Sequence, residues 1–285
     1  MEFQSLNTAI GFAAEVSGID LSQSMDDDIF LSIRDGLDRF GVLVFRGQAL
    51  DEDSQIAFSQ RFGPLETSIR RHRSRNVGRD ELSDISNVAP DGGIYAMDSE
   101  HMSYNLGNQL RHADSSFKKI PALASLLYAM EVPPRGGETE FCDQRAAWDH
   151  LDEAMQTRLE GLTGQHSLAH SRAKTSYEAD KSFREGELAE VPPVPQALVH
   201  RGHGPQGAVC RRQSGPRRPH GGGGQRCLAG GAAATGGGAA IATSAHLATG
   251  RLGDLGRLGH PAQGPAWINQ CRRVMRRTTV AGDKP

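Results

Sequence analysis

The composition of this 285-residue chain changes abruptly near residue 200. Residues 1–200 contain 32 acidic and 19 basic residues, whereas residues 201–285 contain 12 Arg, one Lys, two Asp and no Glu. Residues 201–270 also hold 18 of the 34 Gly, and neither Phe nor Tyr. Such a segment has little apolar surface to offset the loss of chain entropy on folding. We therefore expect a folded part over residues 1–199, disordered or irregular chain over 200–270, and a separate C-terminal part over 271–285.

Several broad classes of protein are excluded by the same sequence. It has no run of about 18 apolar residues, which predicts no membrane span. The first residues, MEFQSLNTAI, lack the basic, apolar and small-residue order of a secretory signal, which predicts a cytoplasmic protein. The four cysteines show no CxxC spacing and are too sparse for a disulfide scaffold. The sequence leaves open whether the chain forms a homo-oligomer.

Hydrophobic spacing in the first 200 residues predicts helices packed outside short buried strands. The expected helices cover residues 24–40, 51–62 and 143–162, and the first of them presents Ile29, Ile33, Leu37 and Phe40 on one face. The expected strands cover residues 42–45, 82–88, 122–132 and 139–141. This order favours an α+β chain built around a β-sandwich or barrel.

A basic stretch between Arg70 and Arg79 has two interpretations. It is typical of a solvated loop, and it also suits a cationic site for an anionic substrate. Under the second hypothesis, arginines such as Arg71 and Arg79 hold the carboxylate of the substrate.

The segment NQLRHADSSF, residues 108–117, carries the most informative pattern. His112 and Asp114 are two residues apart, so on a strand both side chains face the same way. An imidazole and a carboxylate so placed, with one more His, form the facial triad that leaves positions open on Fe(II). Alone, the H-x-D pattern is common by chance and does not establish a metal site.

Four segments together are more specific: FGVLVFRGQALDEDSQIAFSQRFGPLE, LSDISNV, NQLRHADSSF and VPPRGGETEFCDQRAAW. They resemble the taurine dioxygenase family of Fe(II)/2-oxoglutarate dioxygenases, and within it the branch that acts on dichlorophenoxyacetate. The resemblance runs from about residue 10 to 198 and resumes at CRRVMRRTTVAGD, residues 271–283. It implies a mainly β fold with flanking helices, the double-stranded β-helix or jelly roll.

The resemblance also implies cofactors, substrates and site residues. Fe(II) and 2-oxoglutarate would act with dioxygen on a small anionic substrate, and an aryloxyacetate would yield a phenol and glyoxylate, with succinate and CO2. Neither nucleic acid nor a membrane is an expected partner. The implied residues are His112 and Asp114 for iron, and Thr139 and Arg273 for 2-oxoglutarate. Asn108 would lie in the substrate pocket, and Arg277 would bind the substrate or support the same carboxylate end of 2-oxoglutarate. An arginine suits such a role because a guanidinium binds a carboxylate with two parallel hydrogen bonds.

The sequence departs from the family pattern beside the metal and at the third ligand. Arg111 and Ala113 flank the first His, where the family usually has Trp and then Thr or Ser. The second His of the family lies about 11 residues before the 2-oxoglutarate arginine, which corresponds here to Ala262. His260 is two residues away from that position, and the strand motif around it is missing.

A shifted reading frame accounts for this loss. Read one base later, the codons from residue 250 onward are compatible with Gly-Asp-Leu-Val-Ile-Trp-Asp, and those of residues 259–266 with Ala-Thr-Leu-His-Arg-Gly-Arg-Pro. The hidden His codon straddles Ala262 and Gln263. We infer one indel near residue 200 and a compensating one near 267–271, which would leave the jelly roll incomplete and the chain impaired. The alternatives are a non-catalytic relic and an Arg/Gly-rich nucleic-acid-binding tail.

Overall fold

The computed structural model describes residues 1–9, 11–67, 77–99, 101–102, 105, 112–134, 137–173, 191–201, 208–210, 229–230, 238–243, 247–249 and 271–282. Its largest element is a seven-stranded sheet of order β1-β2-β3-β12-β5-β14-β4. The strands are, in that order, β1 (Glu2–Asn7), β2 (Phe12–Ser17), β3 (Val42–Phe45), β12 (Gly238–Thr243), β5 (Ala124–Glu131), β14 (Val274–Val280) and β4 (Leu82–Asp84). Neighbouring strands are antiparallel except β2 and β3, which are parallel.

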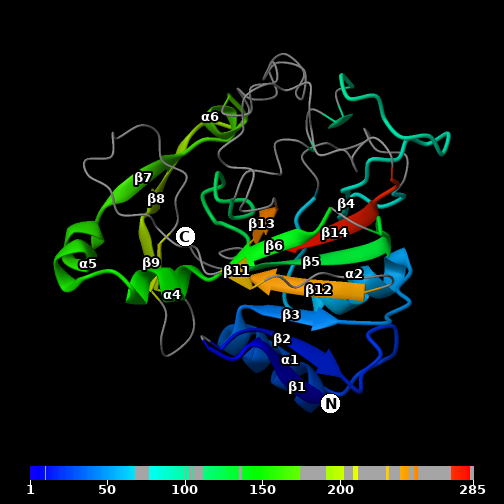
Figure 1. Ribbon diagram of the computed structural model, residues 1–285, viewed down its shortest axis with the longest axis horizontal. Coiled ribbons are helices and arrows are strands. Elements are labelled where there is room, and N and C mark those ends of the chain that lie inside the picture. Colours follow the sequence, from blue (N-terminus) through cyan, green and yellow to red (C-terminus); the bar gives the residue numbers. More distant parts are fainter. Residues whose placement is uncertain are drawn as a thin grey trace.

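Two helices pack against this sheet, α1 (Asp27–Phe40) and α2 (Glu52–Gln60) (Figure 1). Helix α1 ends at Gly41, whose φ of 73° is a left-handed conformation that glycine adopts without steric cost. Helix α2 begins after Asp51, whose carboxylate accepts a hydrogen bond from the Ser54 backbone N–H at 2.7 Å. The prediction of both helices is confirmed, although the apolar face of α1 was misassigned at one position: Ile29 is 38% exposed, and Phe30 is buried instead.

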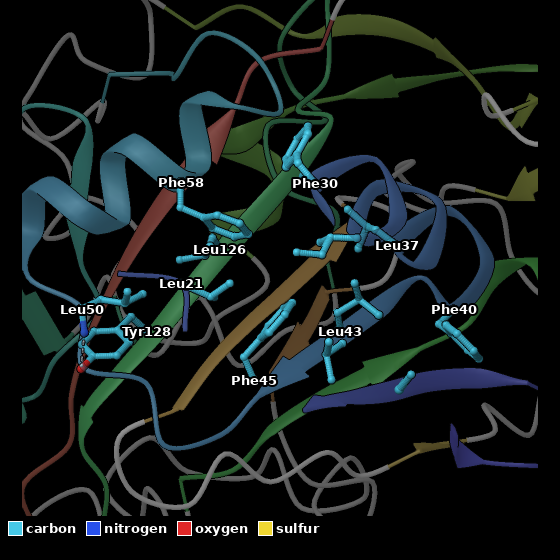
Figure 2. Close-up of a cluster of buried hydrophobic side chains, with 14 residues drawn as sticks. Leu21, Phe30, Leu37, Phe40, Leu43, Phe45, Leu50, Phe58, Leu126 and Tyr128 are labelled. Carbon is cyan, nitrogen blue, oxygen red and sulfur yellow. Dashed lines mark hydrogen bonds between the residues drawn. The ribbon is translucent and has the colours of Figure 1, made fainter. Parts of the chain in front are cut away.

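The main core lies between these helices and one face of the sheet. Figure 2 shows Phe30 and Leu37 of α1 and Phe58 of α2 directed toward Phe45 and Leu126 of the sheet. Alternate residues of the same strands, such as Val44 and Leu127, pack in other clusters on the opposite face. The runs at 42–45 and 124–129 are buried because both faces of their sheet are covered there.

Smaller sheets lie beside the large one. A three-stranded sheet of order β11-β6-β13 is centred on β6 (Thr139–Cys142), with β11 (Ala229–Gly230) and β13 (Leu247–Thr249) at its edges. Two further pairs are formed by β7 with β8 and by β9 with β10. These strands and the last described helix are β7 (Thr163–His166), β8 (Val194–Ala197), β9 (Val199–Arg201), β10 (Ala208–Cys210) and α6 (Leu168–Ala173).

The single helix expected over residues 143–162 is wrong. The structure has two short helices there, α4 (Gln144–Asp149) and α5 (Glu153–Leu159). The Asp152 carboxylate accepts a hydrogen bond from the Met155 backbone N–H at 2.7 Å, so a new helix begins where the pattern suggested a continuous one. Leu162, expected on the buried face, is 47% exposed.

Irregular chain throughout residues 200–270 is also wrong where that segment is described. Strand β12 lies between β3 and β5, with Ile241 paired to Leu43 on one side and to Leu126 on the other. Strands β11 and β13 pair with β6 in the small sheet. Backbone hydrogen bonds form a sheet without any requirement for bulky side chains, so an Ala- and Gly-rich segment can complete it. The other residues of 200–270 lie outside the described part.

None of the helices in the described part of the chain has the length and hydropathy needed to span a bilayer.

Candidate active site

Strand β14 presents its arginines to opposite faces of the large sheet. Arg276 faces α2, where its Nε donates to Gln55 Oε1 at 2.7 Å and its Nη2 donates to the Leu50 carbonyl at 2.6 Å. Arg277, the next residue, faces the other way and reaches Asp114. Because side chains alternate along a strand, the face opposite the helices receives Arg277, and Arg276 is held in the core.

Arg273, just before β14, is a partly buried cation whose partners among the described residues are neutral acceptors. Its guanidinium donates to the carbonyls of Gly137 at 2.9 Å and Ile85 at 3.2 Å, and to Thr139 Oγ1 at 3.3 Å. Burial lowers the pKa of Arg273 to about 10, which still leaves it protonated near neutral pH. Burying a charge without a counter-ion is costly, so this position favours an anionic ligand.

Asn87 holds the backbone of this arginine in place. Its Oδ1 accepts from the Arg273 backbone N–H at 2.7 Å, and its Nδ2 donates to the Cys271 carbonyl at 2.9 Å. The chain at 85–87 also runs beside β14, through Ile85 N–H to Met275 and Asn87 N–H to Arg273. The strand expected over residues 82–88 is therefore shorter, ending at Asp84, but the extended pairing continues past it.

His112 and Asp114 lie together, although residues 112–114 form no strand, the setting in which the spacing would place both side chains on one side. His112 Nε2 is 3.4 Å from Asp114 Oδ1, and the Asp114 side chain is 5% exposed. The Ser125 hydroxyl donates to Asp114 Oδ2 at 2.5 Å, and Arg277 Nη1 donates to Oδ1 at 3.0 Å. Burial alone would raise the pKa of Asp114, but Arg277, His112 and Ser125 outweigh it and hold this pKa well below its usual range.

These donors match part of the iron site that the sequence predicts. An imidazole nitrogen and a carboxylate oxygen are ligands suited to Fe(II), and they are close enough to reach one cation. Among the described residues, however, no third His, Cys, Asp or Glu joins them in a group that could hold a metal ion. Position 262, where the third ligand is expected, is an alanine and lies outside the described part. The described chain thus supplies two of three ligands.

The structure does not place the other predicted site residues, Arg79, Asn108 and Arg71, beside His112 and Asp114. The structure places Arg79 in an exposed ion pair with Asp53 of α2, 2.6 Å from Nη1 to Oδ1, and not with His112 or Asp114. Asn108 and Arg71 lie outside the described residues. The structure does bring Thr139 and Arg273 together, and it brings His112, Asp114 and Arg277 together.

Sequence reasoning missed two residues of this site, Asn87 and Ser125. Asn87 lies near the end of the strand predicted over LSDISNV, residues 82–88, and a polar residue at a strand end is a signal for a site. Ser125 is the one serine in the apolar run ALASLLYAMEV, and a buried serine there indicates a polar partner.

Solved structures share this fold. The structure of AAD-2 in complex with Mn(II) and N-oxalylglycine has a TM-score of 0.79 and 29% identity, over 100% of this chain and 98% of that one. A putative alpha-ketoglutarate dependent 2,4-D dioxygenase from Burkholderia xenovorans has a TM-score of 0.71 over 99% of this chain and 97% of that one. At 23% identity, this second likeness concerns the fold alone. The expected jelly-roll class is confirmed.

The chain belongs to the taurine catabolism dioxygenase TauD, TfdA family, whose model matches residues 2–223. An alpha-ketoglutarate-dependent 2,4-dichlorophenoxyacetate dioxygenase of Cupriavidus pinatubonensis is 43% identical over 197 residues, 68% of each chain. A (S)-phenoxypropionate/alpha-ketoglutarate-dioxygenase of Sphingobium herbicidovorans is 36% identical over 196 residues, 66% of this chain and 63% of that protein. The family and these relatives are 2-oxoglutarate-dependent dioxygenases, and the matched part spans about two thirds of the relatives' length.

Proposed function

We propose that this chain carries the site of an Fe(II)- and 2-oxoglutarate-dependent dioxygenase acting on a small anionic substrate, an aryloxyacetate such as 2,4-dichlorophenoxyacetate. In the overall reaction, 2-oxoglutarate and dioxygen become succinate and CO2, while a substrate C–H becomes C–OH. The hydroxylated aryloxyacetate is a hemiacetal, which separates into a phenol and glyoxylate. The relatives and the solved structure with N-oxalylglycine, an analogue of 2-oxoglutarate, support this choice of substrates.

The partly buried Arg273 is the observation that carries the proposal. Among the described residues, the partners of its guanidinium are neutral: two backbone carbonyls and the Thr139 hydroxyl. A carboxylate bound there would accept a charge-assisted hydrogen bond from Arg273 and a second hydrogen bond from Thr139. We assign the distal carboxylate of 2-oxoglutarate to this position. Arg272, the preceding residue, instead forms an exposed ion pair with Glu131 and is assigned no role.

His112 and Asp114 would hold the iron, and bound iron would supply the activation of dioxygen. Ser125 fixes one oxygen of Asp114 and so orients the carboxylate toward His112. Arg277 lies beside them and is the candidate partner for the carboxylate of the substrate. Contributions from Asn108, Arg71 and Arg79, a cytoplasmic location and homo-oligomer formation stay predictions.

The chain as it stands is proposed to be impaired. A site with two of three protein ligands holds Fe(II) weakly, because each ligand contributes to metal affinity. The reading-frame hypothesis explains the alanine at position 262. Sequencing the encoding DNA across codons 195–275 tests that hypothesis directly.

Binding of 2-oxoglutarate to the full chain tests the role of Arg273 without requiring turnover. By equilibrium dialysis, Arg273→Met is expected to weaken binding at least about tenfold, equivalent to about 1.4 kcal/mol. Arg273→Lys keeps the charge but not the planar guanidinium. Its affinity for 2-oxoglutarate is expected to lie between those of the unchanged chain and Arg273→Met. The matched control Arg272→Gln changes an exposed arginine one residue away and is expected to bind like the unchanged chain.

Equal 2-oxoglutarate binding by the unchanged chain and Arg273→Met, with both proteins folded by circular dichroism, contradicts the proposal. A non-catalytic relic predicts no binding by any of these proteins. Retention on DNA or RNA that weakens with salt would instead favour the Arg/Gly-rich binding tail.

A further inference from the structure

The chain turns sharply just after Asp114. Ser115 has a φ of 53°, in the left-handed region where a residue with a Cβ is strained. It is buried, and its carbonyl accepts from the Lys118 backbone N–H at 2.9 Å, which closes a turn. A strained backbone of this kind persists only where the surrounding structure holds it, and such residues cluster at functional sites. Other residues must therefore hold Ser115 in this conformation.

Glu66 contacts both ends of this turn. Its Oε2 accepts from Ser115 Oγ at 2.6 Å and from Lys118 Nζ at 2.8 Å. The Glu66 side chain is 11% exposed, so water screens its charge less than that of a surface glutamate. The far end of the turn is also fixed by β8, because the Lys118 carbonyl accepts from Gln196 Nε2 at 2.6 Å. A single carboxylate thus clamps the strained turn.

The backbone of Glu66 is attached to the strand that carries Arg277. The Glu66 N–H donates to the Thr279 carbonyl of β14 at 2.8 Å. Arg277 lies two residues before Thr279 on that strand, and its Nη1 donates to Asp114 at 3.0 Å. The ion pair and the Glu66 contacts are therefore two connections between the same turn and the same strand.

We propose that Glu66 is a positioning residue, which holds the strained turn at Ser115 and so directs the Asp114 carboxylate toward Arg277. Without the Glu66 carboxylate, Ser115 relaxes toward a negative φ, because that conformation relieves its strain. The change redirects the chain beside Asp114 and moves its carboxylate away from the guanidinium. Glu66 acts through Ser115 and is not a catalytic residue.

This inference rests on the proposed function only in taking Asp114 and Arg277 as residues of the site. The positioning itself requires neither a metal nor a substrate, so it can be measured on the full chain alone. Glu66→Gln is the variant to use, because it keeps the size of the side chain, removes the charge that attracts Lys118 and weakens the bond from Ser115.

Urea unfolding of Glu66→Gln, Asp114→Asn and the double variant forms a thermodynamic cycle. If Glu66 positions Asp114, its substitution destabilises less once Asp114 has lost its charge. The effect of the double variant on the unfolding equilibrium constant is then expected to be smaller than the product of the single effects by at least about fivefold. A clamp that merely stabilises the turn gives effects that multiply, and direct repulsion between the two carboxylates reverses the sign of the coupling.

The guanidinium resonances of Arg277 in the 15N-labelled chain give a second measurement. An ion-paired guanidinium is held by charge-assisted hydrogen bonds, so its Nη protons are expected to exchange slowly in the unchanged chain and to be assigned by their loss in Arg277→Lys. Glu66→Gln is expected to remove these signals, and Ser115→Gly added to it to restore them, because glycine adopts a positive φ without steric cost. Glu131→Gln, which breaks an exposed ion pair with Arg272, is the matched control and is expected to leave them unchanged.

Multiplying effects in the cycle, or Arg277 signals in folded Glu66→Gln that match those of the unchanged chain, overturn the positioning role. Failure of Ser115→Gly to restore the signals overturns it as well. If Glu66→Gln does not fold by circular dichroism, Lys118→Gln, which removes one of the two bonds to Glu66, takes its place with the same expected directions. Failure of the proposed function is seen elsewhere, in 2-oxoglutarate binding that does not respond to Arg273→Met, so the two failures are distinguishable.

Discussion

At the scale of single residues, the site contains one buried carboxylate paired with an arginine and one partly buried arginine held by neutral groups. Asp114 is stabilised as a carboxylate by Arg277, His112 and Ser125, while Arg273 is surrounded by carbonyls and one hydroxyl. The H-x-D spacing predicted that His112 and Asp114 would lie together. It could not predict the ion pair to Arg277, because those residues are 163 positions apart and meet only through the sheet.

The lowered pKa of Asp114 makes stability depend on acid pH. An ionised Asp114 stabilises the fold above the ordinary carboxyl pKa of about 3.9, and that contribution is lost as pH falls below it, through the lowered folded-state pKa. Asp114→Asn is therefore expected to cost about 3 kcal/mol of unfolding free energy at pH 7, because it removes the buried negative charge that pairs with Arg277. The difference from the unchanged chain should shrink toward pH 2.

Urea unfolding between pH 7 and pH 2 measures this difference. Asp53→Asn, which removes an exposed ion pair with Arg79, is the control and should change stability by less than about 1 kcal/mol. A constant difference between Asp114→Asn and the unchanged chain at every pH would rule out the ionised Asp114 as a source of stability.

At the scale of elements, periodicity and caps predicted the parts with strong local signals. Helices α1 and α2 have apolar faces and clear ends, and β3 and β5 are continuous apolar runs. The break between α4 and α5 was missed because the cap at Asp152 interrupts a spacing that otherwise continues. Strand β12 was missed because GAAIAT has a single bulky apolar residue, Ile241, and no alternation of apolar and polar residues. Its place depends on the edges of β3 and β5 that it joins.

Ile241→Pro tests whether β12 belongs to the sheet. Proline removes a ladder donor in a strand with neighbours on both sides, so unfolding free energy is expected to fall by roughly 2 kcal/mol or more. Ile241→Val keeps a strand-forming residue and is the matched control. Thermal and urea unfolding measure both variants, and equal stability of the two would place β12 outside the folded sheet.

At the scale of the whole molecule, the C-terminal strand β14 assembles the site. It lies between β5 and β4, so residues 271–282 are brought against segments near residues 85, 114 and 139 (Figure 1). Local pattern contains no information on such pairing, and the resemblance to a family supplied it. What neither could supply is the arrangement around position 262, which lies outside the described residues.

Succinate release is the most direct measurement of the central claim, which is a 2-oxoglutarate dioxygenase site that has lost its third ligand. It should be made with Fe(II), 2-oxoglutarate, dioxygen and 2,4-dichlorophenoxyacetate, on the chain as it stands and on the protein encoded when codons 200–270 are read one base later. The account predicts equal amounts of succinate and phenol from the second protein and little of either from the first. Comparable release by both proteins, or none from the frame-restored one, would contradict it.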